Sequence, residues 1–104
     1  MANNYTGNPI TLDTFSSAID LGNILFGDSN TPFWIENIEW EEPNSVGDTA
    51  TIYDGSGTRM IFNETCSVAK QSLLKKFGGV VRGIYIASGG VSSGTISIFL
   101  STYV

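Results

Sequence analysis

The chain has 104 residues, 41% of them hydrophobic and 14% charged, with ten acidic and five basic side chains and a net charge of −5. This length supports a single domain with one core, and the acidic balance argues against nucleic-acid binding. The lone Cys66 and the lack of histidine exclude an intrachain disulfide, a Cys/His metal site and a histidine-activated nucleophile.

The two ends of the chain lack the usual membrane and export patterns. The longest uncharged stretch, residues 83–104, is interrupted by Gly89-Gly90 and rich in Ser and Thr, so no transmembrane helix is expected there. Residues 1–5 carry neither a basic region nor an apolar run, which predicts no secretory signal. We therefore expect a protein that stays in a cytosol or leaves the cell by lysis, without membrane contact.

Residues 1–15 are expected to form an N-terminal arm and a first edge strand. The start of this segment is polar, as in an arm that orders on contact. The rest places Ile10, Leu12 and Phe15 along a short strand that begins at a proline, a residue that edge strands tolerate. Residues 16–104 are predicted to form a single β-sandwich domain.

A long aromatic strand is predicted next. Residues 19–26 are interpreted as a short strand with a bend at Gly22, and residues 27–32 as a turn. Residues 33–42 then alternate in polarity up to Pro43. Strict alternation along this strand predicts two faces, with Trp34, Ile38 and Trp40 on one and Phe33 and Ile35 on the other.

Two hairpins are predicted in the second half. Residues 49–53 and 58–63 are β-prone runs joined by residues 54–57, whose Asp-Gly start is a strong turn signal because Gly accepts a positive φ. Residues 82–86 and 95–100 form a second pair, joined by a turn rich in Gly and Ser. The residues predicted to share a face are Ala50 and Ile52 in the first hairpin, and Ile96, Ile98 and Leu100 in the second.

Between the hairpins, residues 67–77 are compatible with a helix or a strand. Ala69, Leu73 and Phe77 are spaced by four, which favours one or two helical turns, while a strand along a sheet edge stays open. Six to eight short strands with Gly-rich turns predict an all-β fold. We expect an antiparallel β-sandwich, jelly-roll-like, with at most one short helix.

Four acidic residues lie within seven positions: Glu36, Glu39, Glu41 and Glu42. Paired carboxylates can hydrolyse glycosides, and clustered ones can bind Ca²⁺. Alternation, however, sends Glu36 and Glu42 to one face of the strand and Glu39 and Glu41 to the other. A solvated strand end that protects a sheet edge is therefore favoured, and we expect no catalytic residue, cofactor or metal site.

The charges are distributed unevenly along the chain. Residues 1–64 hold all ten acids and a single basic residue, Arg59, whereas residues 65–104 hold four basic residues and no acid. The favoured explanation is internal, with the two halves facing each other across the domain. Packing between subunits or docking on a charged partner is the alternative.

Three segments occur in a recognisable order. They are Trp34-Ile-Glu-Asn-Ile-Glu-Trp40, then residues 46–57 with Gly-Asp-Thr-Ala and Asp-Gly-Ser-Gly, then Arg82-Gly-Ile-Tyr-Ile86 with residues 93–100. This order resembles small virion structural proteins of tailed bacteriophages, in which an Ile-x-Trp strand precedes a Gly-Asp-x-Ala strand, an Asp-Gly-x-Gly turn and a closing hairpin. Here Ser97 and Phe99 stand where the closing strand of that group has tyrosine.

The resemblance implies a non-enzymatic capsid decoration (cement) protein, or another accessory protein of the head or tail. The expected partner is the major capsid protein, and a homo-oligomer is expected, with a trimer favoured. The expected location is the virion capsid, after assembly in the host cytoplasm. The alternative is a carbohydrate- or receptor-binding module of a phage tail fibre, and a β domain with a general interaction role is the third possibility.

Contacts with such partners are expected in the N-terminal arm and the aromatic strand, because tryptophan is the residue type most often found as an interface anchor. Trp34 and Trp40, with Tyr53 and Tyr85, could instead form a sugar-stacking platform; an exposed tryptophan favours this interpretation and burial of both favours the structural one. The expected interface residues are Ile10, Leu12, Phe15, Phe33, Trp34 and Trp40.

Overall fold

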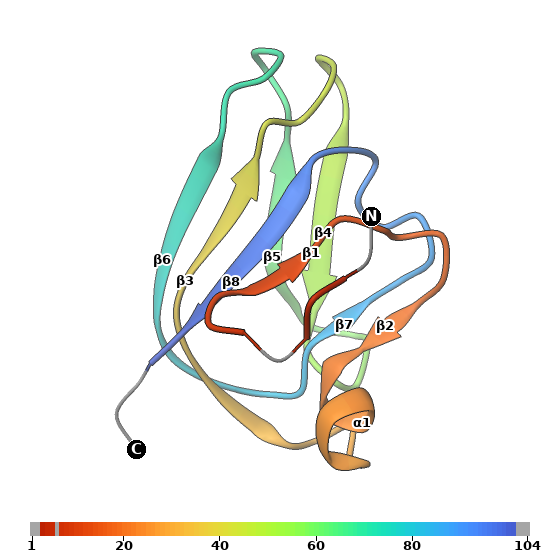
Figure 1. The fold of residues 1–104 in the computed structure, drawn as a ribbon, viewed down its shortest axis with the longest axis vertical. Helices are drawn as coiled ribbons and strands as arrows, with labels where there is room; N and C mark the ends of the chain where they lie inside the picture. The colour runs from red at the N-terminus through yellow and green to blue at the C-terminus, as the bar shows by residue number, and fades with distance from the viewer. Residues whose placement is uncertain (1–2, 6, 102–104) are drawn as a thin grey trace.

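The protein folds into two four-stranded antiparallel sheets packed face to face (Figure 1). The computed structural model describes residues 3–5 and 7–101. Its elements are β1 (Ile10–Leu12), β2 (Ile19–Asp20), α1 (Leu21–Phe26), β3 (Pro32–Glu41), β4 (Thr49–Tyr53), β5 (Met60–Thr65), β6 (Leu73–Arg82), β7 (Tyr85–Ile86) and β8 (Thr95–Leu100). One sheet, the β3 sheet, has the order β1-β8-β3-β6, and the other, the β4 sheet, has the order β2-β7-β4-β5.

The strands pair as a set of nested hairpins. β1 pairs with β8, β2 with β7, β3 with β6 and β4 with β5, always antiparallel. Successive pairs lie alternately in the β3 sheet and the β4 sheet, and the β3–β8 and β4–β7 contacts join them. This is the jelly-roll arrangement. The predicted all-β sandwich or jelly roll with at most one short helix is confirmed.

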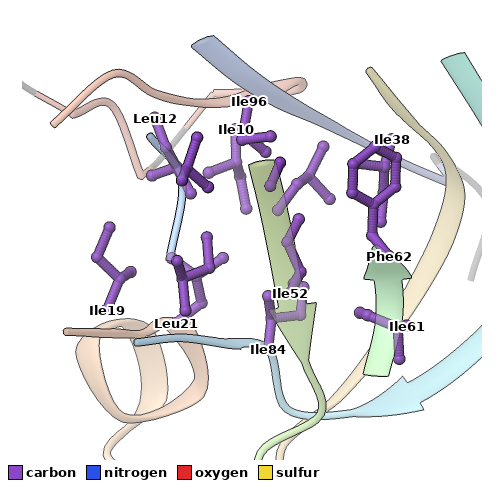
Figure 2. Packing of buried hydrophobic residues seen from close by; sticks show 14 of the residues in the cluster. Ile10, Leu12, Ile19, Leu21, Ile38, Ile52, Ile61, Phe62, Ile84 and Ile96 are labelled. Atoms are coloured by element: carbon purple, nitrogen blue, oxygen red, sulfur yellow. The ribbon is translucent and has the colours of Figure 1, made fainter. Parts of the chain in front are cut away.

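Isoleucine dominates the core between the sheets. Figure 2 shows Leu12, Ile10 and Ile96 pointing toward Ile19, Leu21, Ile52 and Ile84. Branching at Cβ limits the rotamers of isoleucine and fits it to a pleated sheet, so its side chains lose little freedom on packing. The fully buried large side chains are Trp40, Phe62, Ile10, Leu12, Leu21, Ile35, Ile38, Ile52, Ile84, Ile86, Ile96 and Ile98.

The first predicted hairpin is confirmed, and the second is wrong. β4 pairs with β5 in the expected order, with Ala50 and Ile52 buried. β7 and β8, however, lie in different sheets. The predicted strand over residues 82–86 is divided at Gly83, which has a φ of 82° and donates its amide hydrogen to the carbonyl oxygen of Thr31 at 2.8 Å. Because a Cβ at Gly83 would overlap the carbonyl oxygen of Ser29, only glycine fits where the chain crosses between sheets.

The short helix lies in a different place from the one favoured by the sequence. The strand expected over residues 19–26 ends at Asp20, whose side chain caps α1 by accepting a hydrogen bond from the Asn23 amide at 3.2 Å. Residues 67–77, where helical turns were favoured, instead hold a turn and the start of β6. Leu73 and Phe77 do pack on the core, since residues spaced by four share a face in a strand as well as in a helix.

A bulge divides β3 into two halves. Phe33 and Ile35 are buried before it, and Ile38 and Trp40 are buried after it. The register with both neighbouring strands shifts between Ile35 and Asn37. Against β8 the extra residue is Glu36 of β3, whereas against β6 the extra residue lies in β6, between Gly79 and Lys76. The predicted common face of Trp34, Ile38 and Trp40 is therefore wrong: the extra residue reverses the alternation, so Trp34 points outward.

Candidate binding surface

Five of the six expected interface residues lie inside the folded protomer. Ile10, Leu12, Phe15, Phe33 and Trp40 are all buried, whereas Trp34 is 52% exposed. The N-terminal segment does have a core to enter, because β1 pairs with β8 over three residues. In the folded protomer these five side chains stabilise the sandwich, and of the six expected residues Trp34 alone is largely exposed.

Hydrogen bonds hold the N-terminal segment against the β3 sheet. The amide of Asn4 donates to the carbonyl oxygen of Thr11 at 2.8 Å, and the Thr11 amide donates back to Asn4 at 3.0 Å. The side chain of Asn8 accepts from the Leu100 amide at 2.9 Å and donates to the Leu100 carbonyl oxygen at 3.1 Å. These contacts attach the segment along β1 and the end of β8, so its described residues belong to the sandwich. Residues 1, 2 and 6 of the predicted arm lie outside the described residues.

An apolar groove opens beside α1, at the end of the β3 sheet where β3 begins and β6 ends (the lower end in Figure 1). Its volume is about 460 Å³. Phe26 is 64% exposed on its rim, with its ring centroid 6.2 Å from that of the buried Phe33. Trp34 forms another wall, fixed by a hydrogen bond from the Ser101 amide to its carbonyl oxygen at 2.9 Å. The lining residues, all uncharged, are Tyr5, Gly7, Ile10, Leu25, Phe26, Pro32, Phe33, Trp34, Leu100 and Ser101.

An acidic cleft lies at the other end of β3, with a volume of about 670 Å³. Glu39, Glu41 and Glu42 line it together with Lys70. The predicted separation of the four glutamates is therefore only partly right: Glu42 has a φ of 50° and turns back to the side of Glu39 and Glu41, while Glu36 stays in the bulge. Desolvation, followed by the neighbouring carboxylates of Glu39 and Glu42, raises the pKa of Glu41.

The described residues hold no cluster suited to metal binding. Among them, no three His, Cys, Asp or Glu side chains gather closely enough to hold a metal ion. Cys66 is buried and donates its thiol hydrogen to the carbonyl oxygen of Val68 at 3.3 Å, as expected of a packed structural thiol. No helix in the described part of the chain is long and apolar enough to cross a membrane.

The four aromatic residues considered as a sugar platform do not gather on one surface. Trp40 is fully buried, and its indole nitrogen donates to the carbonyl oxygen of Ser93 at 2.8 Å. Tyr53 and Tyr85 are paired partners in the β4 sheet, whereas Trp34 lies in the β3 sheet. Trp34 alone of the two tryptophans is available to a ligand.

The sequence did not reveal Phe26 and Val80 as surface residues. Phe26 is the last residue of α1, which is capped by Asp20 at its start and ends at Gly27 with a φ of 70°. An Asp followed seven residues later by a Gly is a pattern that could have predicted this short helix from the sequence. Val80 lies opposite Trp34 across β3 and β6 and is 52% exposed. Its position depends on that register, which the sequence does not specify.

The five basic side chains form no ion pair within the described chain, although ten acids are present. The Lys75 ammonium group bonds to a carbonyl oxygen, that of Ile61, at 3.3 Å. Lys70 of the basic half lies in the same cleft as the acidic residues Glu39, Glu41 and Glu42, without an ion pair in residues 3–5 and 7–101.

Comparison with known proteins gives no relative: no protein-family model matches the chain, and no curated protein or solved structure matches it significantly.

Proposed function

We propose that the protein is a non-enzymatic structural protein of a tailed-phage virion, which decorates the capsid and stabilises it by binding the major capsid protein. The single observation that carries the proposal is the uncharged groove rimmed by Phe26 and Trp34 on an otherwise well-packed sandwich. Large exposed aromatic side chains around an apolar hollow are typical of protein-binding sites. The ordered motifs that resemble phage virion proteins supply the identity of the partner.

The physical requirements of a decoration protein agree with this architecture. Covering a side chain such as Phe26 contributes on the order of 1–2 kcal/mol, which is too little for durable attachment of a single copy. A homo-oligomer would attach at several points and increase the overall affinity without stronger contacts. Jelly rolls recur in viral capsid domains and in lectins, although this is an analogy of fold alone.

The test uses shells of the phage that encodes the chain, assembled without this protein. We expect the wild-type protein to sediment with these shells and to raise their resistance to heat. Phe26→Ala should weaken binding at least about tenfold, as for an interface anchor. Val46→Ala is the matched control, because Val46 is 67% exposed on the loop at the other end of β3. Wild-type protein that fails to sediment with the shells, or equal binding by both variants, would contradict the proposal.

A sugar-binding module of a tail fibre is the second candidate, favoured by the exposure of Trp34 beside the groove. Aromatic rings stack on sugars, but sugar hydroxyls also need polar partners, and the groove lining is mostly apolar. Saturable binding of a glycan that is lost in Trp34→Ala, together with no binding to shells, would select this function instead.

A further inference from the structure

The outer face of the β3 sheet is unusually apolar for a surface in contact with solvent. One face of a sandwich sheet packs on the core and the other is normally polar. Here the outward side chains include Trp34 and Val80, which are paired across β3 and β6, and Leu74 near the opposite end of β6. Their exposed fractions are 52%, 52% and 55%. This face therefore has apolar residues toward both of its ends.

Opposite charges occupy the two ends of the same face. Arg82 lies at the lower end of β6, two positions beyond Val80. Glu39 lies toward the upper end, directly opposite Leu74 across β3 and β6, and Glu41 follows it. Lys76, paired with Asn37, is exposed on the same face beside them, so this end carries two acids and one base. Six to eight residues of strand separate the two ends, about 20–25 Å. Neither Arg82 nor Glu39 forms an ion pair within the described chain, so both are available to a partner.

The middle of β6 permits close approach. Gly78 is exposed there, and no atom lies within 4 Å of the position that its Cβ would take. Its φ of 61° lies in the left-handed region that glycine favours, at the register shift between β3 and β6. The face thus has an open centre at Gly78, between an apolar, basic end and an end that holds Glu39, Glu41 and Lys76.

We propose that this face binds the same face of a second copy of the chain. The strands of one copy run antiparallel to those of the other, and a two-fold axis near Gly78 relates the two copies. Reversal places Arg82 of one copy beside Leu74 and Glu39 of the partner subunit, and the two-fold repeats this contact. Packing without reversal would place the acidic ends on each other, and like charges in an interface are strongly unfavourable. The two-fold pair is thus isologous, using one patch twice.

The size of the face predicts a weak pair. Three to four strands with a spacing of about 4.8 Å and a length of about 30 Å cover roughly 450–600 Å², less than the roughly 800 Å² per partner of a standard stable interface. We therefore expect dissociation in the micromolar range. On a crowded surface this weak pairing would be strengthened by multivalency. The inference does not depend on shell binding, because it rests on the residues of β3 and β6; Trp34 is common to this face and the groove, whereas Phe26 belongs to the groove alone.

The test is sedimentation equilibrium from about 1 μM to about 500 μM protein, a range that brackets micromolar dissociation. Wild-type protein should change from monomer to dimer. Arg82→Glu and Glu39→Arg should each weaken dimerisation at least about tenfold, because each places like charges together. Arg59→Glu, a charge reversal at an exposed position just before β5 of the other sheet, is the matched control.

An equimolar mixture of Arg82→Glu and Glu39→Arg should dimerise again. In one half of the mixed pair the introduced carboxylate at position 82 meets the introduced guanidinium at position 39. In the other half, the native Glu39 of the first variant meets the native Arg82 of the second. Opposite charges therefore face each other in both halves, and the mixture recovers what each variant alone has lost.

Several results would overturn the inference. A monomer at all concentrations, a trimer, equal effects of all three charge reversals, or no recovery in the mixture would each exclude the reversed two-fold pair. Circular dichroism of each variant would verify that it is folded. The mixture contains only these two variants, so it needs no additional folding control. Phe26→Ala separates this inference from the proposed function, because it should weaken shell binding and leave dimerisation unchanged.

Discussion

The two halves of β3 place the two tryptophans of the chain in opposite environments. Beyond the bulge, Trp40 is fully buried, with its indole nitrogen bonded to the carbonyl oxygen of Ser93 at 2.8 Å. Before the bulge, Trp34 is 52% exposed and walls the apolar groove. The two residues are six positions apart, an even spacing that would place them on one face of a regular strand.

One inserted residue accounts for this difference. Glu36 shifts the register of β3 with β8 between Ile35 and Asn37, and the inward positions are odd-numbered before the bulge and even-numbered after it. Bulges commonly redirect side chains near functional sites. In this protein the bulge allows one strand to supply a core anchor at one end and a binding surface at the other.

Removal of the bulge should have the largest effect. Deletion of Glu36 would turn either Phe33 and Ile35 or Ile38 and Trp40 outward, and two large side chains at roughly 1.5–3 kcal/mol each amount to about 3–6 kcal/mol. We expect chemical denaturation to show a loss of this size or an unfolded chain. Glu36→Ala keeps the strand length and is the control, with a change within about 0.5 kcal/mol. A deletion variant as stable as wild type would show that the bulge does not set the alternation.

Truncation of each tryptophan should separate the two halves of β3. Trp40→Ala removes a fully buried ring and should lower the free energy of unfolding by about 3–5 kcal/mol. Trp34→Ala should lower it by less than about 1 kcal/mol, since half of that side chain is already in solvent. Urea titration of both variants gives the two values. Similar losses in the two variants would contradict the assignment of core and surface roles.

A smaller, pH-dependent effect is expected at the acidic end of β3. Desolvation and the nearby carboxylates raise the pKa of Glu41 in the folded state, so its ionised form is less favourable there than in the unfolded chain. This penalty is fully present above the folded pKa and disappears below the unfolded one. Glu41→Gln should therefore slightly stabilise the protein at neutral pH, and the gain should vanish as the solution becomes acidic.

Asp54 provides a control of opposite sign. Hydrogen bonding, first of all from the Ser56 hydroxyl at 2.6 Å, lowers the pKa of Asp54. Its contribution to stability is present above the unfolded pKa and is lost as the pH falls through the folded one. Asp54→Asn should thus destabilise the protein at neutral pH, with the difference disappearing in acid. Urea unfolding of both variants across the pH range would contradict this assignment if the two differences had the same sign.

Local patterns in the sequence predicted most of the strands but not their distribution between sheets. The Asp-Gly turn identified the β4–β5 hairpin because its two strands are adjacent in the chain. The placement of β7 and β8 in different sheets depends on contacts between distant residues, and alternation carries no information about them. The spacing of four between Leu73 and Phe77 fits a helix and a strand equally, and pairing with β3 decided it.

Of the candidate groove, the sequence predicted Trp34 as well as Ile10 and Phe33, which line it although they are buried. The five expected contacts other than Trp34 are apolar residues whose sequence suits an interface and a core equally, and the pairing of β1 with β8 made the N-terminal ones core. Phe26 was hidden because the residues of α1 were interpreted as a strand. The acidic cleft was missed because the turn at Glu42 reverses the alternation on which the prediction depended.

The most direct test of the central claim is the accessibility of Trp34 to acrylamide, measured by fluorescence in a Trp40→Phe variant that leaves it as the sole tryptophan. The account predicts strong quenching in dilute protein, less quenching as the concentration rises through the micromolar range, and less again when shells are added. Trp40, measured alone in Trp34→Phe, should resist quenching throughout. Equal quenching of Trp34 at every concentration and with shells would contradict the claim that this face binds a partner.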